Sequence, residues 1–269
     1  MFSWFMETKE RFFLDFQINA ILQAYIYQKT INGVFLTPYT STWLKKDTGI
    51  TAPYIDTRLN ETFILMLEDF LPYSPFWGKI EPLSEYLNFL YKVYIEDQRI
   101  YHLGKGVFFA DYFSIKSLSI SHSSLNHQLG VALLFSRAYL QYNNKKYLQV
   151  FQGIINFIEE TVELWINPAN SDLFYGVKKN FDGSFRFYDK DYVYVTLLDL
   201  LLTQKSFMKL HRGQKNPSIE QLTKKKIQYL SKTKFNIFSE NASKAPGESI
   251  DSQKNIKKLF QEIYGEILF

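Results

Sequence analysis

Four side chains near the predicted helix starts are candidates for acid–base catalysis: Glu61, His127, Tyr188 and Tyr194. A glutamate can serve as general acid or base, and a histidine titrates near neutral pH. A tyrosine can pass a proton or stack on a sugar ring. We therefore predict that these four residues form a catalytic group, provided that the fold brings them together.

A second set of residues has the chemistry of substrate binding. Arg58 and Arg186 can each hold a carboxylate through two parallel hydrogen bonds, which favours an acidic sugar as substrate. We predict three further substrate-binding residues, which lie at predicted helix starts: Asn60, Asn126 and Tyr192. The alternative is structural, because asparagines are typical helix caps and a glutamate is favourable in the first turn of a helix.

These residues belong to a repeated unit made of an aromatic Gly-Val-Phe loop, a polar Leu-Asn element and an apolar helix. In the first copy Gly33–Leu36 leads to Arg58–Glu61, and in the second Gly106–Phe109 leads to Ser124–His127. The copies lie roughly 70 residues apart, a period typical of helical hairpins that stack with equivalent ends together.

Apolar residues at helical spacing identify the helices. Leu83, Leu87, Leu90 and Tyr94 follow this spacing, and the residues from Phe151 to Trp165 follow it over four turns. The predicted helices cover residues 8–30, 59–70, 83–94, 125–143, 151–165, 192–211, 218–231 and 253–267.

Three long connections separate the helices, at residues 31–57, 99–122 and 167–190. In the last of them Phe174–Gly176 and Gly183–Tyr188 have the pattern of two short strands joined by a turn. Stacked hairpins place all their long loops at one end, so the helix starts that follow these loops should converge there. Long loops of this kind are also commonly functional.

The pattern predicts an all-α protein built from helical hairpins, forming an incomplete (α/α) toroid or curved array with short β-hairpins in its long loops. Residues 1–235 would form one domain, and residues 236–269 a linker and a C-terminal helix that packs on it. The segment 241–251 is rich in Ser, Ala, Pro and Gly, and its order does not follow from composition.

Two segments resemble the C-terminal helical domain of glucuronyl C5-epimerases. Ser124–Gly130 is similar to the Leu-Asn helix start of that family. Gly183–Asp189, followed by Tyr192–Leu200, is similar to its Gly-Ser-aromatic-x-x-Tyr-Asp strand and Tyr-rich helix start. The resemblance covers roughly residues 100–205.

The resemblance implies an (α/α) toroid with a glycan cleft at the long-loop end, where Tyr and Glu side chains exchange the proton on C5 of a uronic acid. Tyr188, Tyr194 and Asn126 are the residues that correspond by position. The sequence departs from the family in three ways. The His-rich helix start of the family is replaced by Tyr192–Thr196, the helices make fewer hairpins than a full toroid, and the upstream β-rich region is missing.

Composition excludes several classes of protein. The chain of 269 residues is 46% hydrophobic and 18% aromatic, which is typical of a folded protein. It has no cysteine, so thiol nucleophiles, disulfides and thiolate metal sites are excluded. No P-loop or dinucleotide-binding pattern occurs, and His122 and His127 lack an HExxH arrangement. We therefore expect neither a metal nor a cofactor.

The charge of +4 is unevenly distributed, because residues 204–269 carry +7 and the first 203 residues carry −3. Lys224–Lys226 has the charge to hold nucleic acid, but a solvated helix face is the favoured interpretation. No apolar stretch reaches the roughly 18 residues that span a bilayer. A soluble, cytoplasmic protein is expected.

The leading hypothesis is therefore a protein that binds or processes a carbohydrate, with a glycan or small sugar as ligand and a uronate-containing glycan as the narrower case. As an enzyme it would be epimerase-like, or a lyase or hydrolase that uses acid–base chemistry. The alternative is a non-catalytic helical-repeat scaffold that binds a protein or peptide partner.

Overall fold

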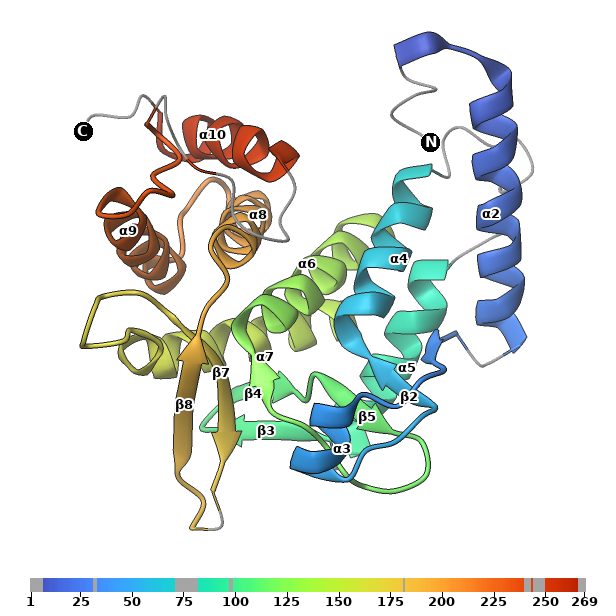
Figure 1. Cartoon of the computed structure of the whole chain (residues 1–269), viewed down its shortest axis with the longest axis horizontal. Coiled ribbons are helices and arrows are strands. Elements are labelled where there is room, and N and C mark those ends of the chain that lie inside the picture. Colours follow the sequence, from blue (N-terminus) through green and yellow to red (C-terminus); the bar gives the residue numbers. More distant parts are fainter. Residues whose placement is uncertain are drawn as a thin grey trace.

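The computed structural model describes residues 7–30, 33–70, 82–96, 99–180, 182–239, 243 and 250–265. Within these ranges the chain is mostly helical, with small antiparallel sheets (Figure 1). The predicted helices are confirmed, with ends that differ by a few residues. They are α2 (Arg11–Thr30), α4 (Thr57–Phe70), α5 (Pro82–Glu96), α6 (Leu125–Tyr142), α7 (Lys145–Thr161), α8 (Val195–Leu210), α9 (Pro217–Ser231) and α10 (Ile250–Tyr264).

Asparagines determine several of the tight turns between helices. Asn143 ends α6 in the left-handed conformation (φ 49°), which asparagine tolerates better than most residues. Asn144 then caps α7 by accepting a hydrogen bond from the Lys146 amide. At α9 the Asn216 side chain accepts from the Ile219 amide, and Pro217 occupies the first helical position, where its missing N–H is not needed.

Helix α6 lies at the centre of the molecule and contacts α4, α7 and α8 (Figure 1). Nearly every side chain from Leu125 to Ser136 is buried, polar ones included. Gly130 permits the close approach of α4, because a Cβ atom there would lie 1.9 Å from Oε2 of Glu61. The helix therefore carries its polar residues into the interior, where they need partners.

The long connections form three small sheets rather than open loops. The predicted hairpin is confirmed as β7 (Phe174–Lys179) and β8 (Phe185–Lys190), joined by β6 (Ser123–Ser124) in the order β6-β7-β8. The other sheets and two short helices lack a clear sequence signal: β1 (Leu36–Thr37), β2 (Tyr54–Asp56) and β5 (Tyr112–Ser114), the pair β3 (Ile100–Leu103) and β4 (Gly106–Phe109), helix α3 (Thr42–Thr48) and the 3-10 helix η2 (Val162–Trp165).

Two of these strands run directly into helices. β2 ends at Asp56 and α4 begins at Thr57, while β6 ends at Ser124 and α6 begins at Leu125. Figure 1 shows β2 to β5 and α3 gathered at one end of α4, α5 and α6. Closure of the helices into a toroid is still a prediction, but these two helix starts lie at the same end of the helices.

The sequence repeat corresponds to a repeated hydrogen-bonded clamp. Asn60 accepts from the Phe35 amide (2.6 Å) and donates to the Phe35 carbonyl (2.9 Å). Gln128 makes the same pair of bonds with the Phe109 amide and carbonyl, both at 2.8 Å. Asn60 and Gln128 are each the fourth residue of their helix. The Leu-Asn match of the sequence is therefore two residues out of register, because Gln128, not Asn126, is the counterpart of Asn60.

The core consists mainly of two apolar clusters. The larger one fills the space between α4, α5, α6, α7 and the small sheets. The second lies between α8, α9 and α10 and contains Tyr194, Leu197, Ile227, Ile256 and Leu259 among others. Helix α10 packs on α8. The division of the chain into a domain at 1–235 and a linker with a C-terminal helix at 236–269 is still a prediction. Most of the segment 241–251 lies outside the described residues.

Among the described helices, none combines the length and the apolar character required to cross a bilayer.

The clamp predicts a matched pair of stability changes. Asn60→Ala and Gln128→Ala each leave a buried backbone N–H and C=O without partners, and each should lower the free energy of unfolding by about 2–4 kcal/mol. Urea denaturation measures this. Asn19→Ala on the exposed face of α2 is the control, with an expected change within about 0.5 kcal/mol. A small effect at both clamp positions would refute the clamp as a stabilising element.

Candidate functional site

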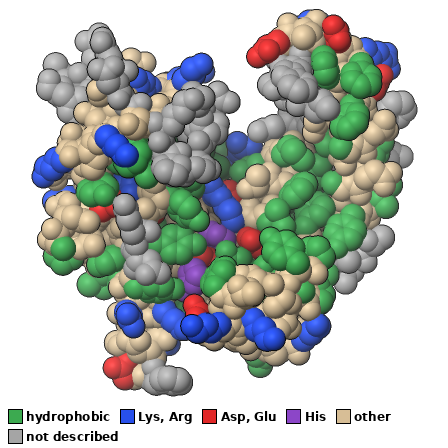
Figure 2. All heavy atoms as spheres, viewed as in Figure 1, with side chains coloured by type: hydrophobic (Ala, Val, Ile, Leu, Met, Phe, Trp, Pro, Cys, Tyr) green, Lys and Arg blue, Asp and Glu red, His purple; other side chains and the backbone are tan. Residues whose placement is uncertain are grey.

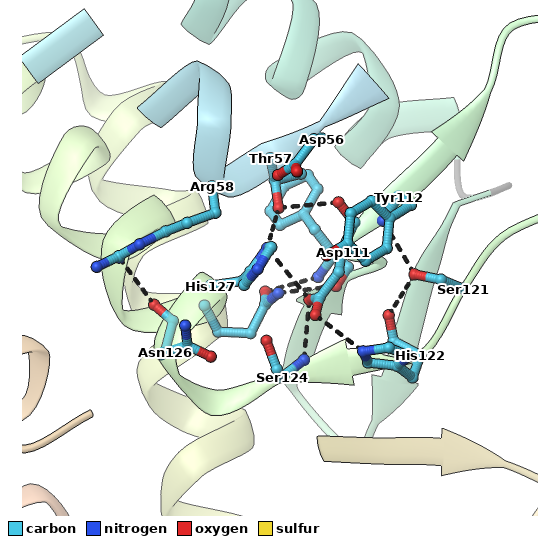
Figure 3. A network of polar contacts seen from close by, with 12 residues as sticks. Asp56, Thr57, Arg58, Asp111, Tyr112, Ser121, His122, Ser124, Asn126 and His127 are labelled. Carbon is cyan, nitrogen blue, oxygen red and sulfur yellow. Dashed lines mark hydrogen bonds and ion pairs between the residues drawn. The ribbon is translucent and has the colours of Figure 1, made fainter. Parts of the chain in front are cut away.

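Asp111 joins four segments of the chain at the long-loop end (Figure 3). Its carboxylate is fully buried and accepts from the Ser124 amide (2.8 Å), and Oδ2 lies 3.3 Å from Nε2 of His122. Its carbonyl accepts from the backbone amide and the hydroxyl of Thr57 (3.0 and 3.1 Å), and its amide donates to the His122 carbonyl (2.9 Å). We call Asp111, Thr57, His122 and His127 the Asp111 cluster.

His127 is held in this cluster by one ring nitrogen. Nδ1 lies 2.7 Å from Oγ1 of Thr57 and 3.6 Å from Oδ1 of Asp111. Because the Thr57 hydroxyl donates its proton to the Asp111 carbonyl, it is an acceptor toward His127. This network assigns the proton to Nδ1 and the lone pair to Nε2, for which no hydrogen bond to a described residue is recorded.

The charges of the cluster follow from burial and proximity. Burial lowers the pKa of His127 below its usual value and outweighs the opposing effect of Asp111, so the imidazole is neutral near pH 7. Burial alone would raise the pKa of Asp111, but His127, His122 and Ser124 hold it below its usual value. The cluster thus pairs an ionised carboxylate with a neutral histidine, the arrangement that orients a general base.

Arg58 forms a second cluster beside the first. One guanidinium nitrogen donates to both oxygens of Glu61 (3.0 and 3.1 Å) and to the Asn126 carbonyl (3.3 Å). The other lies 3.0 Å from the carboxylate of Asp199. The Arg58 side chain is 28% exposed, while those of Glu61 and Asp199 are 4% and 6% exposed. We call these three residues the Arg58 cluster; it connects α4, α6 and α8.

One guanidinium cannot fully compensate two buried carboxylates. Burial raises the pKa of Glu61 to about 8 and that of Asp199 to about 6, despite the opposing effect of Arg58. The charge of Asp199 further raises the pKa of Glu61, so Glu61 retains a proton near neutral pH. The Arg58 cluster therefore contains a carboxyl group with the protonation state of a general acid.

Aromatic side chains surround His122. Four rings lie within 5.6–6.1 Å of its imidazole, measured between centroids, and they belong to Trp43, Tyr112, Tyr175 and Tyr188. Tyr192 packs edge-on against Tyr175 at 5.6 Å. Trp43 and Tyr192 are 44% and 47% exposed, so both present ring surface to solvent.

The two clusters lie in a hollow of the surface. Figure 2 shows histidine side chains at the bottom of this hollow, next to acidic and basic side chains, with apolar side chains along its margins. A cavity of about 620 Å³ opens nearby between α3 and the β7–β8 hairpin, lined by Asp47, Lys178, Lys179, Asn180, Arg186 and Tyr188. Tyr188 borders both the cavity and His122.

Most of the residues predicted for the site lie in this region. Arg58, Glu61, Asn126 and His127 are neighbours within the two clusters. Oδ1 of Asn126 is buried and makes no hydrogen bond within the described part of the chain. Tyr188 and Arg186 line the adjacent cavity, and Tyr192 belongs to the aromatic margin.

Two predicted residues lie elsewhere for clear physical reasons. Asn60 is fully buried, and its amide is used by the Phe35 clamp. Tyr194 is fully buried in the second apolar cluster, where its hydroxyl bonds to the carbonyls of Phe235 and Ser243. Arg58 lies in this region, where both of its terminal nitrogens already donate to protein groups.

Sequence reasoning missed several residues of the site, among them Thr57, Asp111, Asp199 and Trp43. Asp199 had a signal, because a lone carboxylate between leucines of an apolar helix requires a buried partner. Asp111 directly follows an apolar strand, which is a weaker signal. Across the described ranges, no group of three or more His, Cys, Asp or Glu residues is arranged to hold a metal ion.

The fold has counterparts among solved structures. The Lin0763 protein from Listeria innocua superimposes with a TM-score of 0.55 and 10% identity over 96% of this chain and 63% of that one. A family 76 glycoside hydrolase from a bovine Bacteroides thetaiotaomicron strain gives a TM-score of 0.51 and 12% identity over 79% of this chain and 44% of that one. No family model and no curated protein matches the sequence.

These comparisons concern the fold alone, because both identities are very low. The chain spans less than two thirds of the length of either structure. The fold thus has a distant neighbour among glycoside hydrolases, and no sequence match assigns the chain to a family.

The raised pKa of Glu61 predicts a pH dependence of stability. The folded state binds its proton more tightly than the unfolded state between about pH 4.5 and pH 8, so the contribution of Glu61 to stability falls as pH rises through this window. The lowered pKa of His127 acts in the opposite direction, but only below about pH 6.5. Between pH 7 and pH 9 the free energy of unfolding of the wild type should therefore fall by about 1 kcal/mol more than that of Glu61→Gln.

Urea denaturation at several pH values measures this difference. Glu96→Gln, an exposed position on α5, is the matched control and should follow the wild type. Parallel curves for the wild type and Glu61→Gln would show that Glu61 is ionised throughout the window.

Proposed function

We propose that this protein binds a carbohydrate in the hollow above the two clusters and processes it by acid–base chemistry. The observation that carries the proposal is His127, whose Nδ1 is held by Thr57 and Asp111 and whose Nε2 makes no hydrogen bond to the described part of the chain. A neutral imidazole held in this way is suited to remove a proton. The adjacent Arg58 cluster supplies a carboxyl group that is protonated near neutral pH.

The surroundings of the clusters favour a sugar as the ligand. Trp43 and Tyr192 expose ring faces, which suit the apolar faces of sugar rings. The distant fold similarity to a glycoside hydrolase supports the same class of ligand.

The narrower form of the proposal is epimerase-like proton exchange on a uronate. His127 would remove the proton from the carbon next to the carboxylate, and Glu61 or Tyr188 would return one from the other side. In this scheme the charge of Arg58 is already paired with two carboxylates, those of Glu61 and Asp199.

A second candidate function rests on helix α2. Phe12, Phe16 and Ile26 are each more than half exposed on this helix, which protrudes from the body of the molecule (Figure 1). Exposed apolar side chains gathered on one helix are typical of a surface that binds a protein or peptide. This observation favours the scaffold hypothesis, and it is compatible with a glycan in the hollow.

His127→Gln tests the catalytic proposal. A panel of neutral and acidic oligosaccharides is first screened by ligand-observed NMR, and binders are then followed in D₂O for cleavage and for deuterium uptake at carbon. The variant should retain binding within about threefold and lose turnover by at least about 100-fold, because only the proton transfer is removed. His102→Gln on strand β3 is the matched control.

Thr57→Val adds a readout that a change in folding alone would not give. It removes the acceptor for Nδ1–H, so the acid limb of the pH–rate profile should shift while His127 is still present. If the wild type binds an oligosaccharide but shows neither cleavage nor deuterium uptake, the catalytic part of the proposal is wrong and the protein is a carbohydrate-binding protein. Absence of binding to any oligosaccharide would refute the carbohydrate proposal.

A further inference from the structure

Two cations lie directly opposite each other on the β7–β8 hairpin. Lys178 pairs with Arg186 across the antiparallel strands, and both side chains are exposed and line the 620 Å³ cavity. Opposed side chains of this kind have Cβ atoms about 5 Å apart, so like charges repel. Neither residue has a recorded ion-pair partner within the described ranges.

The hairpin is locked with this face outward. The alternate residues Phe185 and Phe187 pack into the core, where their rings lie 5.5 Å from Phe157 and 4.7 Å from Trp165. A slip of the strands by one residue would move these rings to the surface. The repulsion between the two cations is therefore imposed by the register and is not relieved by sliding of the strands.

The cation pair is close to the Asp111 cluster. Gly176 and Tyr188 form the next pair on the same face, two residues or about 7 Å along the strands. There a Cβ atom at Gly176 would contact the His122 ring at 3.4 Å, and the Tyr188 ring lies 5.8 Å from it. One continuous face of the hairpin thus leads from His122 to Lys178 and Arg186.

We infer that Lys178 and Arg186, together with Lys179 at the rim of the cavity, form a subsite for an anionic group of the ligand that occupies the hollow. Lys and Arg donate charge-assisted hydrogen bonds to a carboxylate or a sulfate, and Arg186 can do so in a bidentate manner. Among the residues whose side chains the structure describes, the cavity lining has three basic members, Lys178, Lys179 and Arg186, and one acidic member, Asp47. An anion bound there removes the repulsion across the strands.

The subsite defines a substrate class: a glycan with an anionic substituent about one sugar unit away from the reacting position. That the ligand is a glycan rests on the proposed function. The double variant Lys178→Gln/Arg186→Gln removes the cations without touching either cluster or the core face of the hairpin. Because the two positions are exposed and repel each other, its thermal stability should equal or exceed that of the wild type.

The experiment compares trigalacturonate with its methyl ester, which keeps the sugar and removes the charge. Calorimetric titration at 50 mM and 300 mM salt should show at least about tenfold tighter binding of the acid at low salt, with the difference reduced at high salt. In the double variant both ligands should bind with the affinity of the ester. Lys92→Gln on α5 removes one exposed positive charge elsewhere and should behave as the wild type.

Equal affinities of acid and ester in the wild type, or an unchanged preference in the double variant, would overturn the subsite and leave the proposed function standing. If neither trisaccharide binds, inorganic sulfate is the probe. Shifts of the β7–β8 amide signals with sulfate that the double variant abolishes would support the anion subsite and count against the glycan proposal. Absence of such shifts in the wild type would overturn the subsite.

Discussion

The buried carboxylate of Asp111 is the group on which the arrangement of this end of the molecule depends. Asp111 accepts hydrogen bonds from Thr57 and Ser124, and its amide donates to the His122 carbonyl. These partners lie at the starts of α4 and α6 and in the segment between β5 and β6. A buried carboxylate without partners would be costly, so each partner must be in place when the helices pack. The position of His127 between Thr57 and Asp111 is a consequence of this requirement.

Two cations, Lys226 and Arg58, each pair with two carboxylates but differ in their exposure to solvent. Lys226 is fully buried and lies 2.8 Å from both Asp172 and Asp191, so its charge is compensated and closed off from solvent. It joins α9 to the ends of the β7–β8 hairpin. Arg58 also bridges two carboxylates, but its side chain is partly exposed in the hollow. The first group is suited to hold the fold together, while the second is partly open to solvent.

Local patterns predicted much of the framework. The period of apolar residues predicted the helices because burial of one helical face is the main driving force for these segments, and the Asn-x-x-Gly turn predicted the β7–β8 hairpin. The repeat was recognised, but its register was not, since Asn60 corresponds to Gln128 and the clamp depends on positions along each helix. Helix α3 and the strands β1 to β5 are short, and such elements are stabilised by contacts rather than by their own sequence.

The sequence by itself determined which segments are helices and that two polar helix starts follow equivalent loops, because these features depend on neighbours within a few residues. Only the tertiary structure decided which polar side chains meet. Thr57 and His127 are 70 positions apart, and Arg58 and Asp199 are 141 apart, so no local pattern links them. Burial likewise decided that Tyr194 belongs to a core and that Glu61 retains a proton, because both depend on what surrounds a side chain rather than on what precedes it.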